Sequence, residues 1–194
     1  ISLLHLYLIA WHNLLLDCSK FKQELDVVHS FGYPMQLNPL VTNTKTYAVM
    51  NEASQIEELS IYQESGLPLQ VFCLVNLHTL RVNGTPFVVP LEFDESTPFS
   101  GLSYLISRLT KLRTLSLTNT TVARIPTYSL DALTNLTYLE VDGCGLREIP
   151  FTISSLTNLQ QLRLPRNHLH SIPERTGNSL RRKLTDRLKS QTRC

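Results

Sequence analysis

The sequence predicts an α/β solenoid, in which short parallel strands form one curved sheet and helical turns cover its back. A six-residue unit with apolar residues at positions 1, 4 and 6 begins at Leu77, Leu112, Leu136 and Leu159, and a fainter copy begins at Ile56. Each clear copy is followed by a small or amide residue, an apolar residue and a proline. Self-similarity at a period of ~20–50 residues is typical of repeat architectures.

Each six-residue unit predicts one strand, because its apolar side chains can point inwards while the residues between them face solvent. The stacked strands would bury a continuous core that no single repeat can build. The small or amide position predicts a sharp turn after the strand, and the proline then ends the strand, since proline has no N–H to donate. These positions hold Thr85, Thr120, Cys144 and Asn167, and Pro90, Pro126, Pro150 and Pro173. Residues 151–156 predict a short helical turn on the back of the sheet.

The units begin 21, 35, 24 and 23 residues apart, so one step contains an insertion at about residues 91–102. Insertions into a single repeat usually form loops on one face. The cluster Glu92, Asp94 and Glu95 in this insertion is either a docking determinant or part of a solvated loop.

The register LxxLxLxx(N/C/T)xLxx(I/V)P resembles that of the leucine-rich repeat family over about residues 56–173. The resemblance implies about five repeats, with a parallel sheet on the concave side, helical turns on the convex side and non-repeat caps at both ends. It also implies binding of a protein partner through exposed residues of the concave sheet. The expected partner-binding residues are Tyr62, His78, Arg81, Asn83, Arg113, Tyr138, Glu140, Asp142, Arg163 and Arg166. Aromatic and arginine side chains dominate binding hot spots, and we expect a partner to present carboxylates to the arginines.

Residues 1–55 form an expected N-terminal capping region, with a helix over about Phe21–Phe31 and a strand over about 42–49. Its opening stretch, Ile1–Leu16, is almost entirely apolar and is either a buried capping helix or the remnant of a signal or membrane segment. Residues 174–194 carry seven basic residues against two acidic ones. Leu180, Leu184 and Leu188 predict a short amphipathic helix there, which either caps the last repeat or contacts an acidic membrane surface or a calmodulin-like groove.

Several classes of chemistry are disfavoured. The net charge of +2 argues against nucleic acid as the main ligand, and no common catalytic motif occurs, so we expect neither an enzyme nor a cofactor. His168 and His170 have no third metal ligand nearby in the sequence and are interpreted as turn residues. The four cysteines are far apart, which disfavours zinc and a dense disulfide framework and favours a reducing compartment. Sequons at Asn83, Asn119 and Asn135 are about as many as chance predicts, so by themselves they do not indicate secretion.

The sequence therefore predicts a protein–protein interaction module, interpreted as a scaffold or adaptor in signalling, with the cytoplasm as the favoured location. The alternative is the recognition ectodomain of a cell-surface leucine-rich repeat receptor. The absence of adjacent cysteine pairs at the ends of the repeat region counts against this alternative. A third class is a fragment of a protein whose catalytic domain lies outside these residues.

Overall fold

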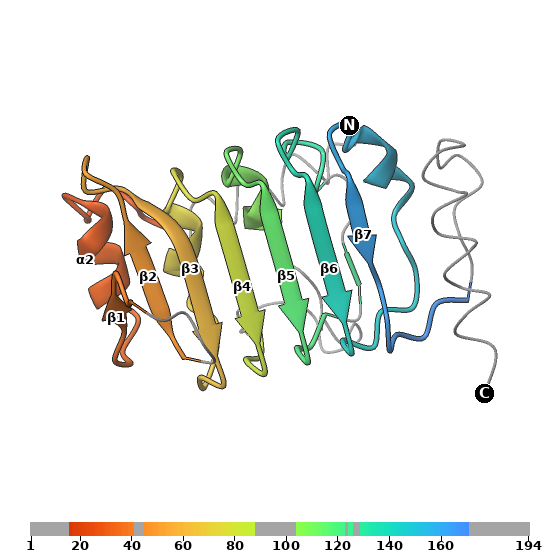
Figure 1. Ribbon diagram of the computed structural model, residues 1–194, viewed down its shortest axis with the longest axis horizontal. Helices are drawn as coiled ribbons and strands as arrows, with labels where there is room; N and C mark the ends of the chain where they lie inside the picture. Colours follow the sequence, from red (N-terminus) through yellow and green to blue (C-terminus); the bar gives the residue numbers. More distant parts are fainter. Residues whose placement is uncertain (1–15, 41–44, 88–103, 123, 126–128, 171–194) are drawn as a thin grey trace.

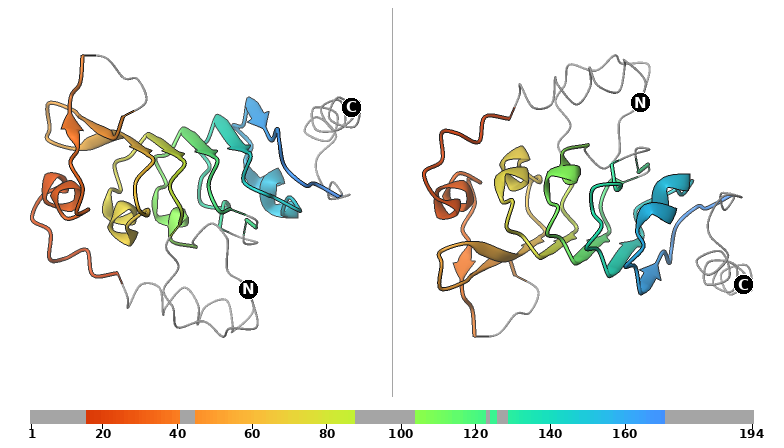
Figure 2. Two further views of the ribbon diagram at one scale, coloured as in Figure 1. Left: turned by 90° about the horizontal axis from the view of Figure 1, so that it is seen from below. Right: turned by 90° about the horizontal axis from the view of Figure 1, so that it is seen from above.

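A computed structural model describes residues 16–40, 45–87, 104–122, 124–125 and 129–170. Within these residues, a seven-stranded sheet runs in the order β1-β2-β3-β4-β5-β6-β7, and the helical segments lie together on one side of it (Figures 1 and 2). The strands are β1 (Gln36–Leu37), β2 (Tyr47–Met50), β3 (Ile56–Tyr62), β4 (Thr79–Asn83), β5 (Thr114–Thr118), β6 (Tyr138–Asp142) and β7 (Gln161–Arg163). We call the side of the sheet away from the helical segments the open face.

The five repeat strands, β3 to β7, pair in parallel without a register shift. Position 4 of each repeat is therefore aligned across the sheet, in the column Leu59, Leu80, Leu115, Leu139 and Leu162. Every residue of this column is buried, as are the residues at position 6. The predicted leucine-rich repeat solenoid is confirmed, because one continuous core runs behind the strands.

Short 3-10 helices connect the strands on the other side of the sheet. They are η1 (Leu69–Cys73), η2 (Tyr104–Arg108) and η3 (Phe151–Ser155). The helical turn predicted for residues 151–156 is thus present as η3. Val71, Ile106 and Ile153 point from these helices into the core, with exposed fractions of at most 1%.

The N-terminal cap contains one expected helix and one expected strand. Helix α2 (Glu24–His29) lies inside the predicted range, with Val27 and Val28 buried. Strand β2 runs antiparallel to β3, unlike the repeat strands, and β1 pairs in parallel with β2 at the edge of the sheet. The Glu24 carboxylate accepts hydrogen bonds from the backbone N–H of Ile56 at 2.5 Å and from the Asn76 amide at 2.9 Å. The helix is thereby fixed to the first two repeats.

Several predicted features lie outside the described residues: residues 1–15 of the apolar stretch, the insertion at 91–102, the basic region 174–194, and Pro90, Pro126 and Pro173. Among the helices that are described, none is long and apolar enough to cross a membrane.

Candidate functional site

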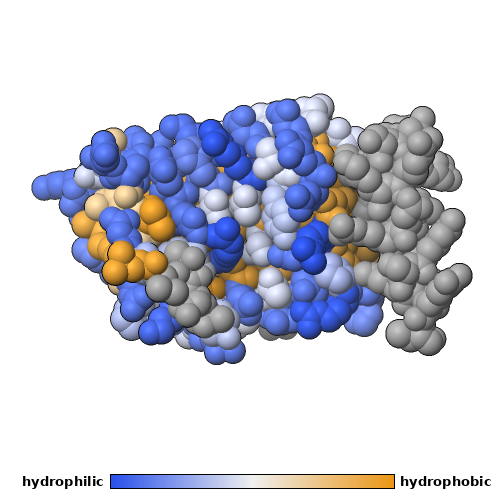
Figure 3. All heavy atoms as spheres, viewed as in Figure 1, coloured by the Kyte–Doolittle hydropathy of each residue, from blue (hydrophilic) through white to orange (hydrophobic). Residues whose placement is uncertain are grey.

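All ten residues expected to bind a partner belong to strands β3 to β7 or to their immediate ends. Seven lie within strands, at positions 3, 5 and 7 of their repeats. His78 and Arg113 directly precede β4 and β5, and Arg166 follows β7. The four arginines are exposed, and the other six residues are half-buried. The parallel register therefore brings these residues together on one polar surface across the middle of the open face (Figure 3).

Carboxylates of neighbouring strands already pair with three of the four arginines. Arg81 pairs with Glu58, and the Nε atom of Arg163 lies 3.5 Å from the Glu140 carboxylate, as expected for the same position on adjacent strands. Arg166 makes a bidentate pair with Asp142 at 2.7 and 2.8 Å. Three of the four arginines therefore already have a carboxylate neighbour within the protein, and the expectation that a partner presents carboxylates to the arginines stays a prediction.

Arg113 differs from the other three arginines. Among the described residues, no carboxylate lies within ion-pairing distance of its guanidinium group. Its backbone carbonyl, in contrast, accepts hydrogen bonds from the N–H groups of Thr137 and Tyr138. The next repeat therefore fixes the backbone of Arg113.

A hollow of about 500 Å³ lies on the N-terminal half of the open face. Its lining residues come from β2 to β5 and are Tyr47, Glu58, Ser60, Tyr62, Arg81, Val82, Asn83, Ser116 and Thr118. Among them, Glu58 accepts hydrogen bonds from the Tyr47 hydroxyl at 2.5 Å and from Arg81. Tyr47 was not anticipated from the sequence, because it belongs to the antiparallel strand β2 and not to a repeat.

On the C-terminal half of the open face, Tyr138 lies beside Glu140. Partial burial raises the pKa of the Tyr138 phenol, and the Glu140 carboxylate raises it further. The hydroxyl therefore stays protonated at neutral pH and can donate a hydrogen bond. Glu140 also accepts a hydrogen bond from the Ser116 hydroxyl at 2.8 Å, which orients the carboxylate.

The turns that follow the strands are held by a ladder of small buried residues, as the sequence predicted for position 9. Thr85, Thr120 and Cys144 are all buried, and the Cys144 thiol contacts the Leu117 and Asp142 carbonyls. The Asn167 side chain donates to the Val141, Leu164 and Pro165 carbonyls and accepts from the N–H groups of Cys144 and Leu146.

The sequence pattern did not predict a second feature of these turns. Position 8 has a positive φ in all five repeats, in the column Gln63, Gly84, Asn119, Gly143 and Arg166. Glycine and asparagine tolerate this left-handed conformation best, and they occupy three of the five positions. Their recurrence at one repeat position was the available signal.

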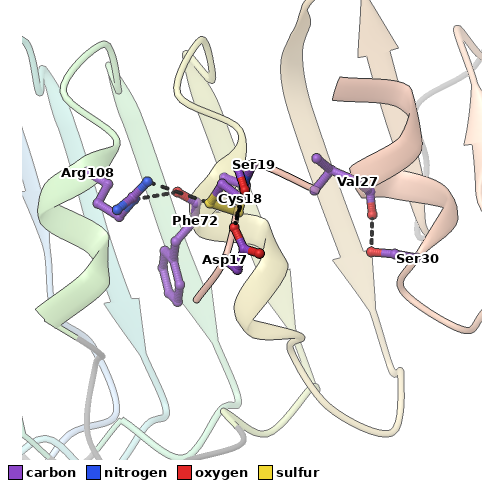
Figure 4. Close-up of a disulfide and its surroundings, with 8 residues drawn as sticks. Asp17, Cys18, Ser19, Val27, Ser30, Phe72 and Arg108 are labelled. Carbon is purple, nitrogen blue, oxygen red and sulfur yellow. Dashed lines mark hydrogen bonds between the residues drawn. A yellow bond between two sulfur atoms is a disulfide. The ribbon is translucent and has the colours of Figure 1, made fainter. Parts of the chain in front are cut away.

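The cysteines also require a correction. Cys18 and Cys73 form a disulfide that joins the segment before α2 to η1 (Figure 4). The prediction of reduced cysteines is therefore wrong for this pair. The sequence spacing did not reveal the bond, because residues 55 positions apart meet only once the segment before α2 has folded onto the first repeats. Cys144 is free and buried, as predicted.

The fold and the register can be compared with known proteins. No protein-family model matches the chain. Over 168 residues, 78% of its length, the chain is 30% identical to the volume-regulated anion channel subunit LRRC8B of Homo sapiens. The chain spans only 20% of that relative's length. Over 63 residues, 32% of the chain and 8% of the relative, it is 44% identical to the channel subunit LRRC8E of Homo sapiens.

Two solved structures share the fold. A plant ice-binding protein aligns with a TM-score of 0.50 and 28% identity, over 63% of this chain and 38% of that one. A chain of the BIR3–SERK2 complex of Arabidopsis thaliana aligns with a TM-score of 0.51 and 24% identity, over 69% of each chain. Together with the repeat register and the in-register parallel strands, these similarities show that the chain belongs to the leucine-rich repeat proteins.

Proposed function

We propose that this chain is a protein-binding module that holds a partner segment on the open face of its sheet. The observation that carries the proposal is the hollow over β2 to β5, which continues into a row of polar side chains on β6 and β7. Pre-formed concave surfaces with convergent polar groups are the usual sites of recognition. Tyr62 and Tyr138 add aromatic contact area at two points of this surface.

The ion pairs define the chemistry that a partner must match. Exposed ion pairs stabilise a protein by only ~0–1 kcal/mol, so Glu58–Arg81 and Glu140–Arg163 contribute little to folding. Their value is that they fix alternating charges in place before binding. A partner with both acidic and hydrogen-bonding groups fits this surface better than a purely acidic partner. The carboxylate of such a partner would lie opposite Arg113.

The Cys18–Cys73 disulfide bears on where such a module works. Structural disulfides form and persist in oxidising environments and are rare in the cytosol. It therefore favours the recognition domain of a secreted or cell-surface protein, and it removes the objection based on absent cysteine pairs. A cytosolic signalling scaffold is the second candidate, and it would require this disulfide to be reduced in the native protein.

The binding proposal can be tested with a peptide selected from a displayed library of random sequences on the wild-type protein. The affinity of this peptide is then measured for a variant with Arg81, Arg113, Tyr138 and Arg163 changed to alanine. A matched control changes Arg124 and Arg147, which are exposed and outside the strands. Loss of at least tenfold in affinity for the first variant alone is expected. Equal affinity for both variants would contradict the proposal.

A further inference from the structure

We propose that Asn135 is a site of N-linked glycosylation, acquired in the oxidising compartment in which the Cys18–Cys73 disulfide forms. The proposal rests on that compartment and not on the binding surface, so the two can fail separately. Three sequons are too few to indicate secretion by themselves. The disulfide supplies the independent observation, because sequons are glycosylated in proteins that pass through a disulfide-permissive secretory route.

The disulfide has the surroundings of a structural bond. Cys73 is 8% exposed and belongs to η1, whose neighbours Val71 and Phe72 are core residues. The Arg108 guanidinium donates to the Phe72 carbonyl at 3.2 Å and lies 3.5 Å from the Cys18 sulfur (Figure 4). The disulfide therefore joins the entry to α2 with η1, and Arg108 attaches η2 to the same place.

The structure distinguishes the three sequons from one another. Asn83 is half-buried at the end of β4 and lines the hollow, and Thr85 of its sequon is fully buried. A glycan there would fill the hollow. Asn119 has a positive φ, and its Oδ1 lies only 2.7 Å from the place that a Cβ on Gly143 would take. Asn119 is exposed, but its amide oxygen packs against Gly143 of the next repeat, at the edge where the strands end.

Asn135 is exposed and lies in the turn before β6, at the opposite edge, where the strands begin. Its Nδ2 atom donates one hydrogen bond, to the Thr110 carbonyl at 2.9 Å. A glycan on this side chain would extend from the edge of the solenoid and leave the open face accessible. Asn135 is thus the sequon that the fold accommodates at least cost.

The transfer itself needs a polyprenyl-pyrophosphate-linked oligosaccharide and its transferase. The amide nitrogen of Asn135 forms a bond to C1 of the first sugar as the bond from C1 to the pyrophosphate oxygen breaks. The lipid pyrophosphate leaves and the amide loses one proton to a base. One N–H remains on Nδ2, so the glycosylated side chain keeps a donor for the Thr110 carbonyl.

Asn158 provides a matched comparison within the same molecule. It occupies the same position in the next repeat, is also exposed, and donates from Nδ2 to the Thr134 carbonyl at 2.7 Å. The residue two positions later is Gln160 and not threonine, so no sequon is present. Gln160→Thr would complete one and should add a glycan at Asn158.

The decisive experiment uses the protein isolated from its own cells. Trypsin places the three sequons on different peptides, because Arg81, Arg108, Arg113, Arg124 and Arg147 separate them. Enzymatic removal of the glycan in ¹⁸O-labelled water converts a glycosylated asparagine to ¹⁸O-labelled aspartate. We expect the label on residue 135 in the peptide 125–147, and recovery of that peptide only with unmodified asparagine would overturn the proposal.

Variants secreted from a eukaryotic cell test whether the fold accepts the glycan at this edge. Asn135→Gln should remove the label from the peptide 125–147, Asn158→Gln should leave it, and Gln160→Thr should add a second labelled site. Secretion of the Gln160→Thr variant at wild-type yield with both sites occupied supports the placement. Aggregation of wild-type protein that carries the glycan at Asn135 contradicts it.

Discussion

At the scale of single residues, the fold depends on columns of identical positions that the parallel register aligns. The inward column at position 4 is fully buried, and the polar ladder at position 9 satisfies the backbone of the turns. Asn167 alone makes five hydrogen bonds, three to residues 141–146 of the preceding repeat and two within its own turn. Cys144 fills the same position one repeat earlier with weaker sulfur contacts. The turn at Asn167 is therefore held by more and shorter side-chain hydrogen bonds than the turn at Cys144.

Leu139 is 1% exposed in the middle of the core column, so Leu139→Ala should lower the free energy of unfolding by ~2–5 kcal/mol. Thr134→Ala, at an exposed turn position, should change it by at most ~0.5 kcal/mol. Urea unfolding followed by circular dichroism measures both. Similar midpoints for the two variants would show that the core column is misassigned.

Gly143 combines a φ of 61° with a Cβ position that would lie 2.7 Å from the Asn119 Oδ1 atom, whereas Gly145 has a φ of 73° and open space. Both alanine variants incur the left-handed penalty of ~1–2 kcal/mol. Gly143→Ala should cost more, because Asn119 must also move. In proteins that also carry Asn119→Gly, the extra loss of stability of Gly143→Ala over Gly145→Ala should disappear. Denaturant unfolding of the two alanine variants, each with and without Asn119→Gly, gives the comparison. An undiminished difference would refute the packing of Asn119 on Gly143.

At the scale of elements, the repeat strands were predictable and the cap was not. Periodic apolar residues located β3 to β7 within one or two residues, because each repeat faces the same packing problem. Strand β2 has no such repetition, and its antiparallel pairing with β3 depends on tertiary contacts, including the hydrogen bond from Tyr47 to Glu58. For the same reason the Cys18–Cys73 bond could not be inferred from spacing. The cap is therefore where the sequence-based account needed most correction.

The disulfide closes a separation of 55 residues, for which the chain-entropy model gives a stabilisation of about 4 kcal/mol, within the usual range of ~2–5 kcal/mol for native disulfides. Replacement of both cysteines with serine should lower the free energy of unfolding by ~2–4 kcal/mol. Reductant should bring the wild-type protein to the same level and leave the variant unchanged. Equal stability of the oxidised wild-type protein and the variant would contradict a structural role for the bond.

At the scale of the whole molecule, the repeat register assigned seven of the ten candidate site residues to strands and placed the other three, His78, Arg113 and Arg166, at strand ends. The register also predicted Glu140 and Arg163 as neighbours, but the ion pairs of Arg81 and Arg166 were not predicted. Glu58 is paired with Thr79, two positions before Arg81 on the next strand, and Asp142 is one repeat position before Arg166, so each carboxylate lies near an arginine of the following repeat. The hollow also depends on β2, which lies outside the repeats. Recognition on this surface is therefore expected to depend on pre-oriented ion pairs more than on unpaired arginines.

The most direct test of binding at the open face is protection of a single reporter thiol by a bound peptide selected on the wild-type protein. Ser60→Cys places a thiol in the hollow, and Ser154→Cys places one on η3, on the opposite side of the sheet. In both proteins Cys194 is changed to serine, so that the buried Cys144 is the remaining natural free thiol. Saturating peptide is expected to slow labelling of the Ser60→Cys protein at least tenfold and to leave the Ser154→Cys protein unchanged. Protection of the thiol on η3 with none in the hollow would contradict recognition by the open face.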